Sequence, residues 1–537
     1  MNHIHSSTKE YDAIIVGAGF SGLYQLICLR DQLGLKCVVL ETGDDVGGTW
    51  YWNRYPGARC DTESHAYSYY FSDELLKEWT WSERYPGHEE IREYMNFVAS
   101  KFDLKKDILF KQKVTSAKFI EDSNNWNVKT DNNNFKCKFL ITAVGCLSNT
   151  NIPKIKGLEN FEGSYYHTGN WPKNGVSFVN KTVGQIGTGS TGIQAVPVIA
   201  AKAKHLTVFQ RTANYSIPAR NKPLTEEFKK QVKENFQYYK DLIKRTPNAH
   251  PFEISDRLVS DVNSVEMNNI YEKAWEKGGL QFRAVFNDLV TNLEANNTAS
   301  DFIKNKINKT VLNKKFASIL SDIDHPYAGK RPPIDSNYFE TYNRDNVNLI
   351  DLRRDPIKCI NKNGIETEKN YIDLDIIVFA TGYDAMTGPL LNMNIFGKNN
   401  LKLKNVWKEG PKTFLGLQIP GFPNLFTITG PGSPSVLTNM PMAIEQHVEW
   451  IRDCISFMIK KEYTTIEASS NLAKKWGEEV NRVANKTLLP SVKHSWYLGA
   501  NIPGKPRVFM PYAGGLPRYS KICDDVKKNN FEDFILA

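Results

Sequence analysis

Two glycine-rich turns, each between a β-branched apolar run and a helical pattern, constrain this chain more than any other feature. The first turn follows residues 12 to 16 (DAIIV), and the second follows the run VGQIG after residue 180. Both have the spacing G-x-G-x-x-G, with Gly17, Gly19 and Gly22 in the first turn and Gly187, Gly189 and Gly192 in the second. Such turns let a pyrophosphate approach bare backbone at a helix N-terminus. The sequence therefore predicts an α/β protein with two Rossmann-like dinucleotide-binding domains.

The residues that end the second strand of each unit differ, and they predict two different dinucleotides. The strand at 36 to 40 ends in Glu41, 19 positions after Gly22, where a carboxylate binds a ribose hydroxyl. The strand HLTVFQ ends in Gln210 and Arg211, and Arg211 lies 19 positions after Gly192. An arginine there favours a 2'-phosphate and hence NADPH over NADH. One chain that binds both cofactors implies hydride transfer from NADPH to a flavin.

The pattern along the chain predicts that both domains are discontinuous. Between 221 and 326 the sequence is rich in Lys, Glu and Asn, with apolar residues at helical spacing from Phe228 to Tyr239, which predicts a helical insertion. Strand patterns resume at 347 to 352 and at 373 to 379. The expected division is FAD-binding domain 1–150, NADP-binding domain 151–220, helical insertion 221–326, NADP-binding domain again 327–384, and FAD-binding domain again 385–537.

Charge and cysteine usage exclude several classes of protein. The net charge is +9, but the lysines are scattered among acids, so no nucleic-acid partner is expected. No apolar run reaches the roughly 18 residues of a membrane span and the start lacks a secretory pattern, which predicts a soluble, cytoplasmic protein without a membrane partner. The eight cysteines form no C-x-x-C pair and no metal-ligand cluster, so a disulfide-reducing flavoenzyme and a metal site are not expected. The oligomeric state is left open.

Residues 161 to 172, FEGSYYHTGNWP, fit the pattern F-x-G-x-x-x-H-x-x-x-W-P, with His167 at its centre and Trp171 and Pro172 at its end. This pattern is the fingerprint of type I Baeyer-Villiger monooxygenases, which the chain resembles over nearly its whole length. The other matching segments are GGTWYWNRYPGARCDTES, IGTGSTGIQ, VFQRT, GKRPPID, TGPGSPSVLTNMP and SWYLGANIPGK. The resemblance implies an enzyme that uses FAD, NADPH and O2 to convert a ketone into an ester or lactone through a C4a-peroxyflavin.

The resemblance also assigns roles to individual residues. Arg331 would stabilise the peroxyflavin anion, because a guanidinium supplies a permanent positive charge and cannot protonate the anion. Asp61 would pair with Arg331 and contact the cofactors, and His167 would couple the domains without acting as a base. The residues expected to contact NADP, besides Asp61 and Arg331, are Arg59, Thr188, Gly189, Ser190, Thr191, Gly192, Gln194, Arg211, Thr212, Lys330 and Trp496. Those expected to contact FAD are Gly17, Gly19, Ser21, Gly22, Glu41, Thr49, Trp50, Tyr51, Trp52, Tyr67 and Met440.

Two alternatives remain at this point. A flavin monooxygenase that oxidises nitrogen or sulfur has a similar fingerprint, but that fingerprint lacks the ending that Trp171 and Pro172 form in this chain. A flavin-binding redox sensor without turnover would not need the pair Lys330 and Arg331. The loop 431–438 is expected to shape the substrate pocket, but it does not identify the ketone.

Overall fold

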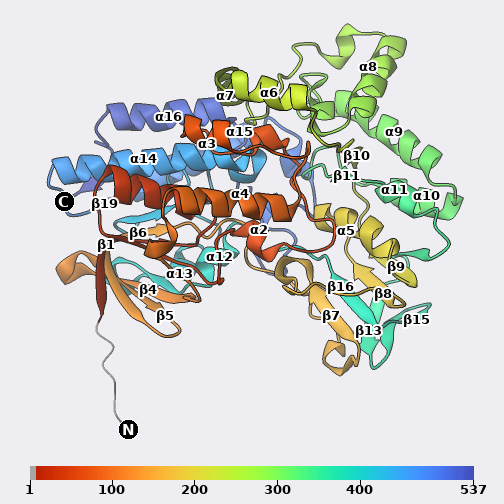
Figure 1. Ribbon diagram of the computed structural model, residues 1–537, viewed down its shortest axis with the longest axis horizontal. Coiled ribbons are helices and arrows are strands. Elements are labelled where there is room, and N and C mark those ends of the chain that lie inside the picture. Colours follow the sequence, from red (N-terminus) through yellow and green to blue (C-terminus); the bar gives the residue numbers. More distant parts are fainter. Residues whose placement is uncertain (1–7) are drawn as a thin grey trace.

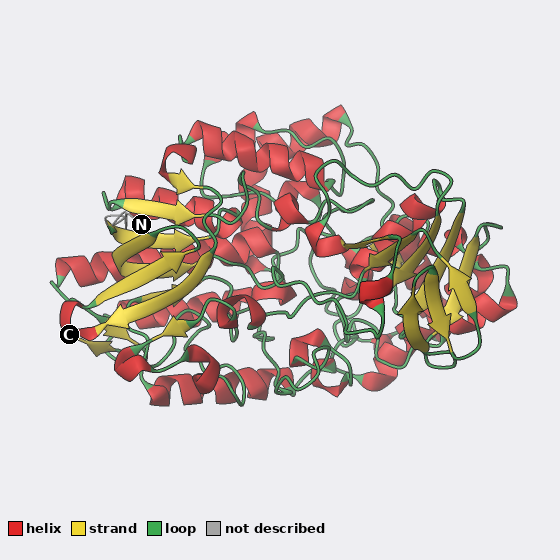
Figure 2. Cartoon of the chain, turned by 90° about the horizontal axis from the view of Figure 1, so that it is seen from below, coloured by secondary structure: helices red, strands yellow, loops and turns green. Residues whose placement is uncertain are grey.

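The computed structural model describes residues 8–537, and its two large β-sheets lie at opposite ends of the molecule (Figure 2). The first sheet has eight strands and is built on β1 (Lys9–Val16). This strand pairs in parallel with β2 (Cys37–Leu40) on one side and with β6 (Asn134–Thr142) on the other. Its remaining strands are β3 (Ile108–Leu109), β4 (Val114–Ile120), β5 (Asn125–Thr130), β17 (Ile395–Phe396) and β18 (Leu425–Thr427). The continuous β-branched run at the end of β1 is fully buried, as expected of a strand covered on both faces.

The second sheet has five strands, all parallel, in the order β12-β9-β8-β16-β7. Its strands are β7 (Ser164–His167), β8 (Thr182–Ile186), β9 (His205–Gln210), β12 (Val347–Asp351) and β16 (Ile376–Phe379). Each glycine-rich turn joins a strand to a helix, as predicted. The first turn leads into α1 (Phe20–Leu26), which continues as a π-helical segment over Ile27–Gln32, and the second leads into α5 (Ser190–Ala200).

The prediction of one strand over residues 373 to 379 is wrong. The run divides into β15 (Tyr371–Asp373), which belongs to a separate antiparallel sheet with β13 (Ile357–Asn361) and β14 (Gly364–Thr367), and β16. Between the two strands the chain changes partners, because Leu374 N donates to Asn363 O whereas Asp375 N donates to Thr182 O. Alternation of apolar residues cannot reveal such a change, since both strands have the same period.

Residues 221–326 are mainly helical, as predicted, and are drawn in green tones at the upper right of Figure 1. The helices are α6 (Glu226–Glu234), α7 (Phe236–Arg245), α8 (Ser264–Lys277), α9 (Leu293–Thr310) and α10 (Lys314–Ser321). Aromatic residues of this segment, such as Tyr271 and Phe302, share one apolar core with Val196 of α5 and Val208 of β9. The insertion is therefore packed onto the second sheet and is not a separate body.

The chain after residue 385 returns to the first sheet. Strand β17 pairs with β4 and β18 pairs with β6, both in parallel. The long helix α14 (Met440–Lys460) then packs against α1, and α16 (Leu516–Lys528) packs against α14 (Figure 1). Within residues 8–537, none of the helices has the length and apolar character needed to cross a membrane.

Candidate active site

The first glycine-rich turn brings the start of α1 directly against the end of β1. A Cβ on Gly22 would lie 1.8 Å from the carbonyl oxygen of Gly17, so only glycine allows this approach. The backbones of Gly19 and Gly48 also touch, because a Cβ on Gly48 would lie 2.8 Å from Gly19 Cα. Ser21 is buried in the first turn of the helix. This bare backbone is suited to a pyrophosphate, for which any side chain would be an obstacle.

Glu41 follows β2 and lies beside this turn. Its two carboxylate oxygens accept hydrogen bonds from Ala18 N (2.7 Å) and Gly43 N (2.6 Å), which fix the orientation of the group. Burial raises the pKa of Glu41, although both backbone hydrogen bonds act in the opposite direction. Each carboxylate oxygen can accept a second hydrogen bond, so the group can still receive ribose hydroxyls.

Aromatic residues line the other side of the first turn. The short helix α2 (Thr49–Trp52) begins after Gly48 and carries Trp50, Tyr51 and Trp52. Trp50 Nε1 donates to Tyr67 Oη at 3.1 Å. The start of α14, where Met440 lies, is tied to the same place because Asn439 Nδ2 donates to Ala66 O at 2.6 Å. The residues expected to bind FAD therefore lie around one turn, although they come from both ends of the chain.

The second turn repeats the geometry of the first. A Cβ on Gly192 would lie 2.3 Å from Gly187 O, whereas among the described residues no atom lies within 4 Å of a Cβ built on Gly189. The space at Gly189 leaves its backbone open to a phosphate. Thr188 Oγ1 donates to Thr212 O at 3.1 Å, which joins this turn to the end of β9. Ser190 and Thr191 begin α5.

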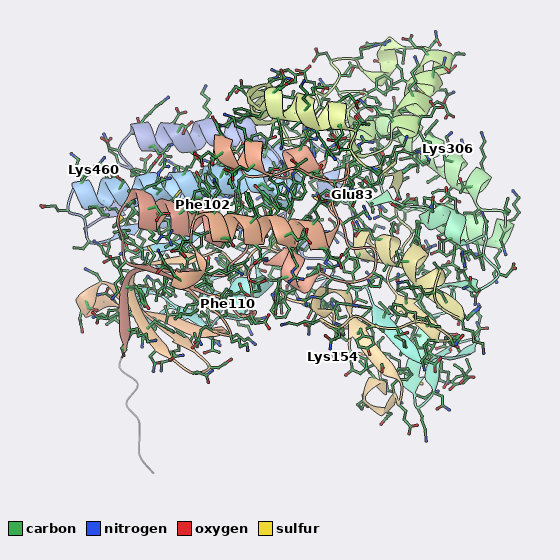
Figure 3. All side chains as sticks on the ribbon, viewed as in Figure 1. Glu83, Phe102, Phe110, Lys154, Lys306 and Lys460 are labelled. Carbon is green, nitrogen blue, oxygen red and sulfur yellow. The ribbon has the colours of Figure 1, made fainter. Side chains whose placement is uncertain are left out.

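Gln194 and Arg59 join the second turn to the first domain. Gln194 Nε2 donates to Arg59 O at 3.1 Å, and Gln194 Oε1 accepts from Tyr55 Oη at 2.7 Å. The Arg59 guanidinium donates to Glu83 Oε1 at 3.1 Å. Glu83 is labelled in Figure 3, where it lies near the middle of the molecule beside the insertion. The two Gln194 contacts cross between the two nucleotide-binding halves, whereas the Arg59–Glu83 contact lies within the first.

Two cations lie beyond the end of β9. The Gln210 side chain turns away and donates to Ile319 O of the insertion at 3.1 Å, while Arg211 is exposed. Burial lowers the pKa of Lys330; the carboxylate of Asp324 opposes this shift and the nearby charge of Arg211 adds to it. Arg211 and Lys330 thus share one environment, which is positive and suited to a phosphate group.

Arg331 is held by a two-pronged ion pair with Asp61, although 270 positions separate the two residues. Arg331 Nε and Nη2 donate to Asp61 Oδ2 and Oδ1, each at 2.6 Å, and Nη1 donates to Val436 O at 2.7 Å. The side chains are only 26% and 18% exposed. Burial would raise the pKa of Asp61, but the charge and hydrogen bonds of Arg331 outweigh burial and lower it. Both groups are therefore charged near neutral pH, and the guanidinium has one fixed orientation.

Trp496 and His167, also named from the sequence, lie on two separate segments of the chain. Trp496 begins a short 3-10 turn, half-buried, with its ring centroid 4.5 Å from that of Tyr497. His167 ends β7, and its Nδ1 accepts from Gly169 N at 3.0 Å. Burial lowers the pKa of His167 to about 4, so it is neutral near pH 7. Its ring lies 6.0 Å from that of Tyr383, whose hydroxyl donates to Asn53 after α2.

Two residues near Arg331 carry no sequence signal. His250 and Arg283 lie in the insertion, within electrostatic range of Arg331, whereas Tyr497, also within that range, belongs to the matched segment SWYLGANIPGK. Val436 contributes only a backbone carbonyl, for which any residue type would serve. A motif marks residue types at fixed spacing, so contacts made by the backbone or by a distant insertion leave no motif.

Comparison with known proteins agrees with this arrangement. A family model described as flavin-binding monooxygenase-like matches residues 11–239. Cyclohexanone 1,2-monooxygenase of an Acinetobacter species is 43% identical over 98% of this chain and 97% of its own length. A Baeyer-Villiger monooxygenase of Pseudooceanicola batsensis is 42% identical over 98% and 96%. Phenazine N-monooxygenase PhzNO1 of Lysobacter antibioticus is 39% identical over 99% and 98%.

Solved structures give the same result. Steroid monooxygenase bound to NADP is 45% identical with a TM-score of 0.93, covering 98% of this chain and 99% of that one. A complex of OTEMO with FAD and NADP is 39% identical with a TM-score of 0.95, covering 99% and 100%. In both comparisons the similarity spans nearly the whole length of the two chains. The chain therefore belongs to the Baeyer-Villiger monooxygenase family.

Proposed function

We propose that this chain inserts one oxygen atom of O2 beside the carbonyl group of a ketone, with FAD as its cofactor and NADPH as its reductant. The observation that carries the proposal is the half-buried Arg331 guanidinium, which Asp61 and Val436 O hold in one orientation. FAD held at the first glycine-rich turn would supply the acceptor for hydride from NADPH and the chemistry that activates O2. The two glycine-rich turns fit these two cofactors, because each offers bare backbone and a different group for the ribose.

Arg331 supplies the charge that the reaction requires from the protein. Oxidation of a ketone in this way passes through negatively charged oxygen atoms, and a preorganised cation stabilises them without reorganisation. Three of the five N–H groups of Arg331 are used by Asp61 and Val436 O. Within the described chain the other two have no acceptor, and they are available to oxygen atoms of the reacting groups. Asp61 orients the guanidinium and also prevents its deprotonation, since its charge raises the pKa of Arg331 despite burial.

The residues named from the sequence are proposed to keep their roles. In support, most of the proposed FAD residues lie at the first turn and on α2, and most of the proposed NADP residues lie at the second turn or beside Arg211 and Lys330. We also propose the division into the FAD-binding parts 1–150 and 385–537, the NADP-binding parts 151–220 and 327–384, and the insertion 221–326. Strand pairing supports it, because β17 and β18 join the first sheet and β12 and β16 join the second. Cytoplasmic location and the lack of a nucleic-acid partner stay predictions of the sequence.

Oxidation of a ring nitrogen is the second candidate, because one relative is a phenazine N-monooxygenase. Product analysis separates the two. Purified protein with FAD and NADPH would be given a panel of cyclic, aromatic and linear ketones, and separately phenazine and related nitrogen heterocycles. We expect esters or lactones from the ketones and little N-oxide. N-oxides as the main products, with no ester from any ketone, would replace the proposed function with the second candidate.

Arg211 should determine the choice between NADPH and NADH. A charged hydrogen bond to the 2'-phosphate is worth about 1.5 to 3 kcal/mol, or roughly a 10- to 150-fold preference. In Arg211→Ala we expect the Michaelis constant for NADPH to rise and the constant for NADH to stay close to its original value. The measurement is kcat/KM for both reductants by steady-state oxidation. Arg518→Ala, at an exposed arginine of α16, provides the control, and an unchanged NADPH/NADH ratio in Arg211→Ala would exclude this assignment.

A further inference from the structure

A second guanidinium, Arg283, lies beside Arg331 without a carboxylate of its own. It belongs to the 3-10 segment Leu280–Ala284 of the insertion and is half-buried. Its one hydrogen bond joins Nη2 to Asn248 Oδ1 at 3.0 Å. No aspartate or glutamate in residues 8–537 lies within ion-pair distance of it, whereas Arg331 has Asp61. A partly desolvated guanidinium without an anion is costly in free energy. The positive charge at this corner of the protein, which Arg283, His250 and Tyr327 form, is therefore not balanced by a negative one.

The two arginines are joined through the loop 431–438. Arg331 Nη1 donates to Val436 O, and Asn248 Nδ2, whose amide oxygen accepts from Arg283, donates to the next carbonyl, Leu437 O, at 2.6 Å. Burial lowers the pKa of Arg283, and the charge of Arg331 acts in the same direction. Arg283 therefore lies within electrostatic range of the Arg331 guanidinium, which is proposed to stabilise the reacting oxygens. It reaches this place from the insertion.

The other polar groups at this corner do not supply the missing negative charge. Burial, with the charges of Arg283 and Arg331, lowers the pKa of His250 to about 3, so this histidine is neutral near pH 7. The Tyr327 hydroxyl is buried near Arg283 and has no hydrogen-bond partner among the described residues. The corner therefore contains an unpaired cation and an unpartnered hydroxyl, and it lacks an anionic acceptor.

We propose that Arg283 binds a carboxylate on the substrate, so that keto acids are the preferred class of ketone. This inference rests on the proposed function, because the ketone end of the same molecule must lie near Arg331. A carboxylate would complete the charge balance, since Arg331 is already neutralised by Asp61 while Arg283 is not. Arginine suits the role because its planar fork can donate two parallel hydrogen bonds to one carboxylate. The Tyr327 hydroxyl would donate a further hydrogen bond.

The test compares each keto acid with its own methyl ester, so that the reacting ketone is unchanged. Substrates of three lengths are 4-oxopentanoate, 6-oxoheptanoate and 8-oxononanoate, and the readout is the acid-to-ester ratio of kcat/KM for oxygenated product. We expect the best keto acid to exceed its ester in wild type, and Arg283→Met to lower that ratio about 10- to 100-fold. Arg283→Lys should keep part of the ratio. Tyr327→Phe, which retains the ring, should lower it about 10-fold, as for one hydrogen bond to a charged acceptor.

Matched controls separate carboxylate binding from a structural role. Arg257→Met, at an exposed arginine of the same insertion that pairs with Glu266, should leave the ratio unchanged. If Arg283 only shaped the loop through Asn248, Arg283→Met would slow acid and ester equally, and the unchanged ratio would overturn the inference. If the wild-type enzyme oxygenated the methyl esters but showed no higher kcat/KM for any keto acid than for its ester, the inference would also be wrong. The proposed function would remain intact. Failure to oxygenate any ketone, acid or ester would refute both.

Discussion

In Arg331→Ala, hydride transfer from NADPH should survive while ester formation falls by roughly 100- to 1000-fold. Removal of a preorganised charge that faces a developing oxyanion costs about 3 to 4 kcal/mol. The glycine-rich turns and Glu41 do not depend on Arg331, so the flavin should still bind and be reduced. Without the charge of Arg331, the electrons of NADPH should end in hydrogen peroxide and not in ester formation. The measurement is ester and hydrogen peroxide formed per NADPH consumed.

A conservative variant makes this prediction sharper. Arg331→Lys keeps the positive charge but cannot make the two parallel bonds that Arg331 makes with Asp61. We expect it to form ester at a rate between those of wild type and Arg331→Ala, with more hydrogen peroxide than wild type. Arg344→Ala, at an exposed arginine after α11 (Tyr338–Thr341), should behave as wild type. If Arg331→Ala formed as much ester per NADPH as the wild type, Arg331 would have no role in the mechanism. Most of the proposed site would then be wrong.

Gly22→Ala should abolish FAD binding. The added Cβ would lie 1.8 Å from Gly17 O and 2.9 Å from Gly17 C, both backbone atoms of the turn that receives the pyrophosphate. Relief requires α1 to move away from β1, and overpacking against backbone atoms costs about 3 kcal/mol, which weakens binding roughly 100-fold. The purified variant should be colourless. The measurement is the flavin absorbance per protein, together with circular dichroism to show that the chain is folded.

Two further glycine variants separate this effect from general damage. Gly192→Ala places a Cβ 2.3 Å from Gly187 O in the second turn, so it should retain yellow FAD but lose tight NADPH binding. Gly477→Ala, inside helix α15 (Ser470–Ala484), meets no described atom within 4 Å and should stabilise the protein by up to about 1 kcal/mol. If Gly22→Ala retained FAD and Gly192→Ala lost it, the first turn would have to be assigned to NADP and the second to FAD.

Local sequence predicts the strand-turn-helix units because their requirements are local. Gly22 and Gly192 must lack a side chain to pack on the preceding turn, and this requirement appears as a spacing of three glycines. Glu41 and Arg211, the residues that follow the second strand of each unit, are also predictable from local sequence because each lies at a fixed distance from its turn. The helical insertion is recognisable by the same logic, because its apolar residues from Phe228 to Tyr239 follow the helical period through α6 and α7.

The contacts that complete the site are not local, and composition or spacing could not predict them. Asp61 meets Arg331 across 270 positions, and only the resemblance to a family suggested the pair. Arg283 and His250 reach Arg331 from the insertion, whose sequence shows only helical surface patterns. The mistaken single strand at 373 to 379 has the same origin, since the change of partner at Leu374 and Asp375 depends on segments far away in sequence.

The central claim is that an atom of O2 enters the ketone, and isotope labelling tests it most directly. The wild-type enzyme, with NADPH and the best ketone of the panel, would be run under ¹⁸O₂ and the product analysed by mass spectrometry. We predict an ester or lactone that carries one ¹⁸O atom per molecule, with one NADPH consumed for each. Ester without the label, or hydrogen peroxide as the only product from every ketone tested, would contradict the claim.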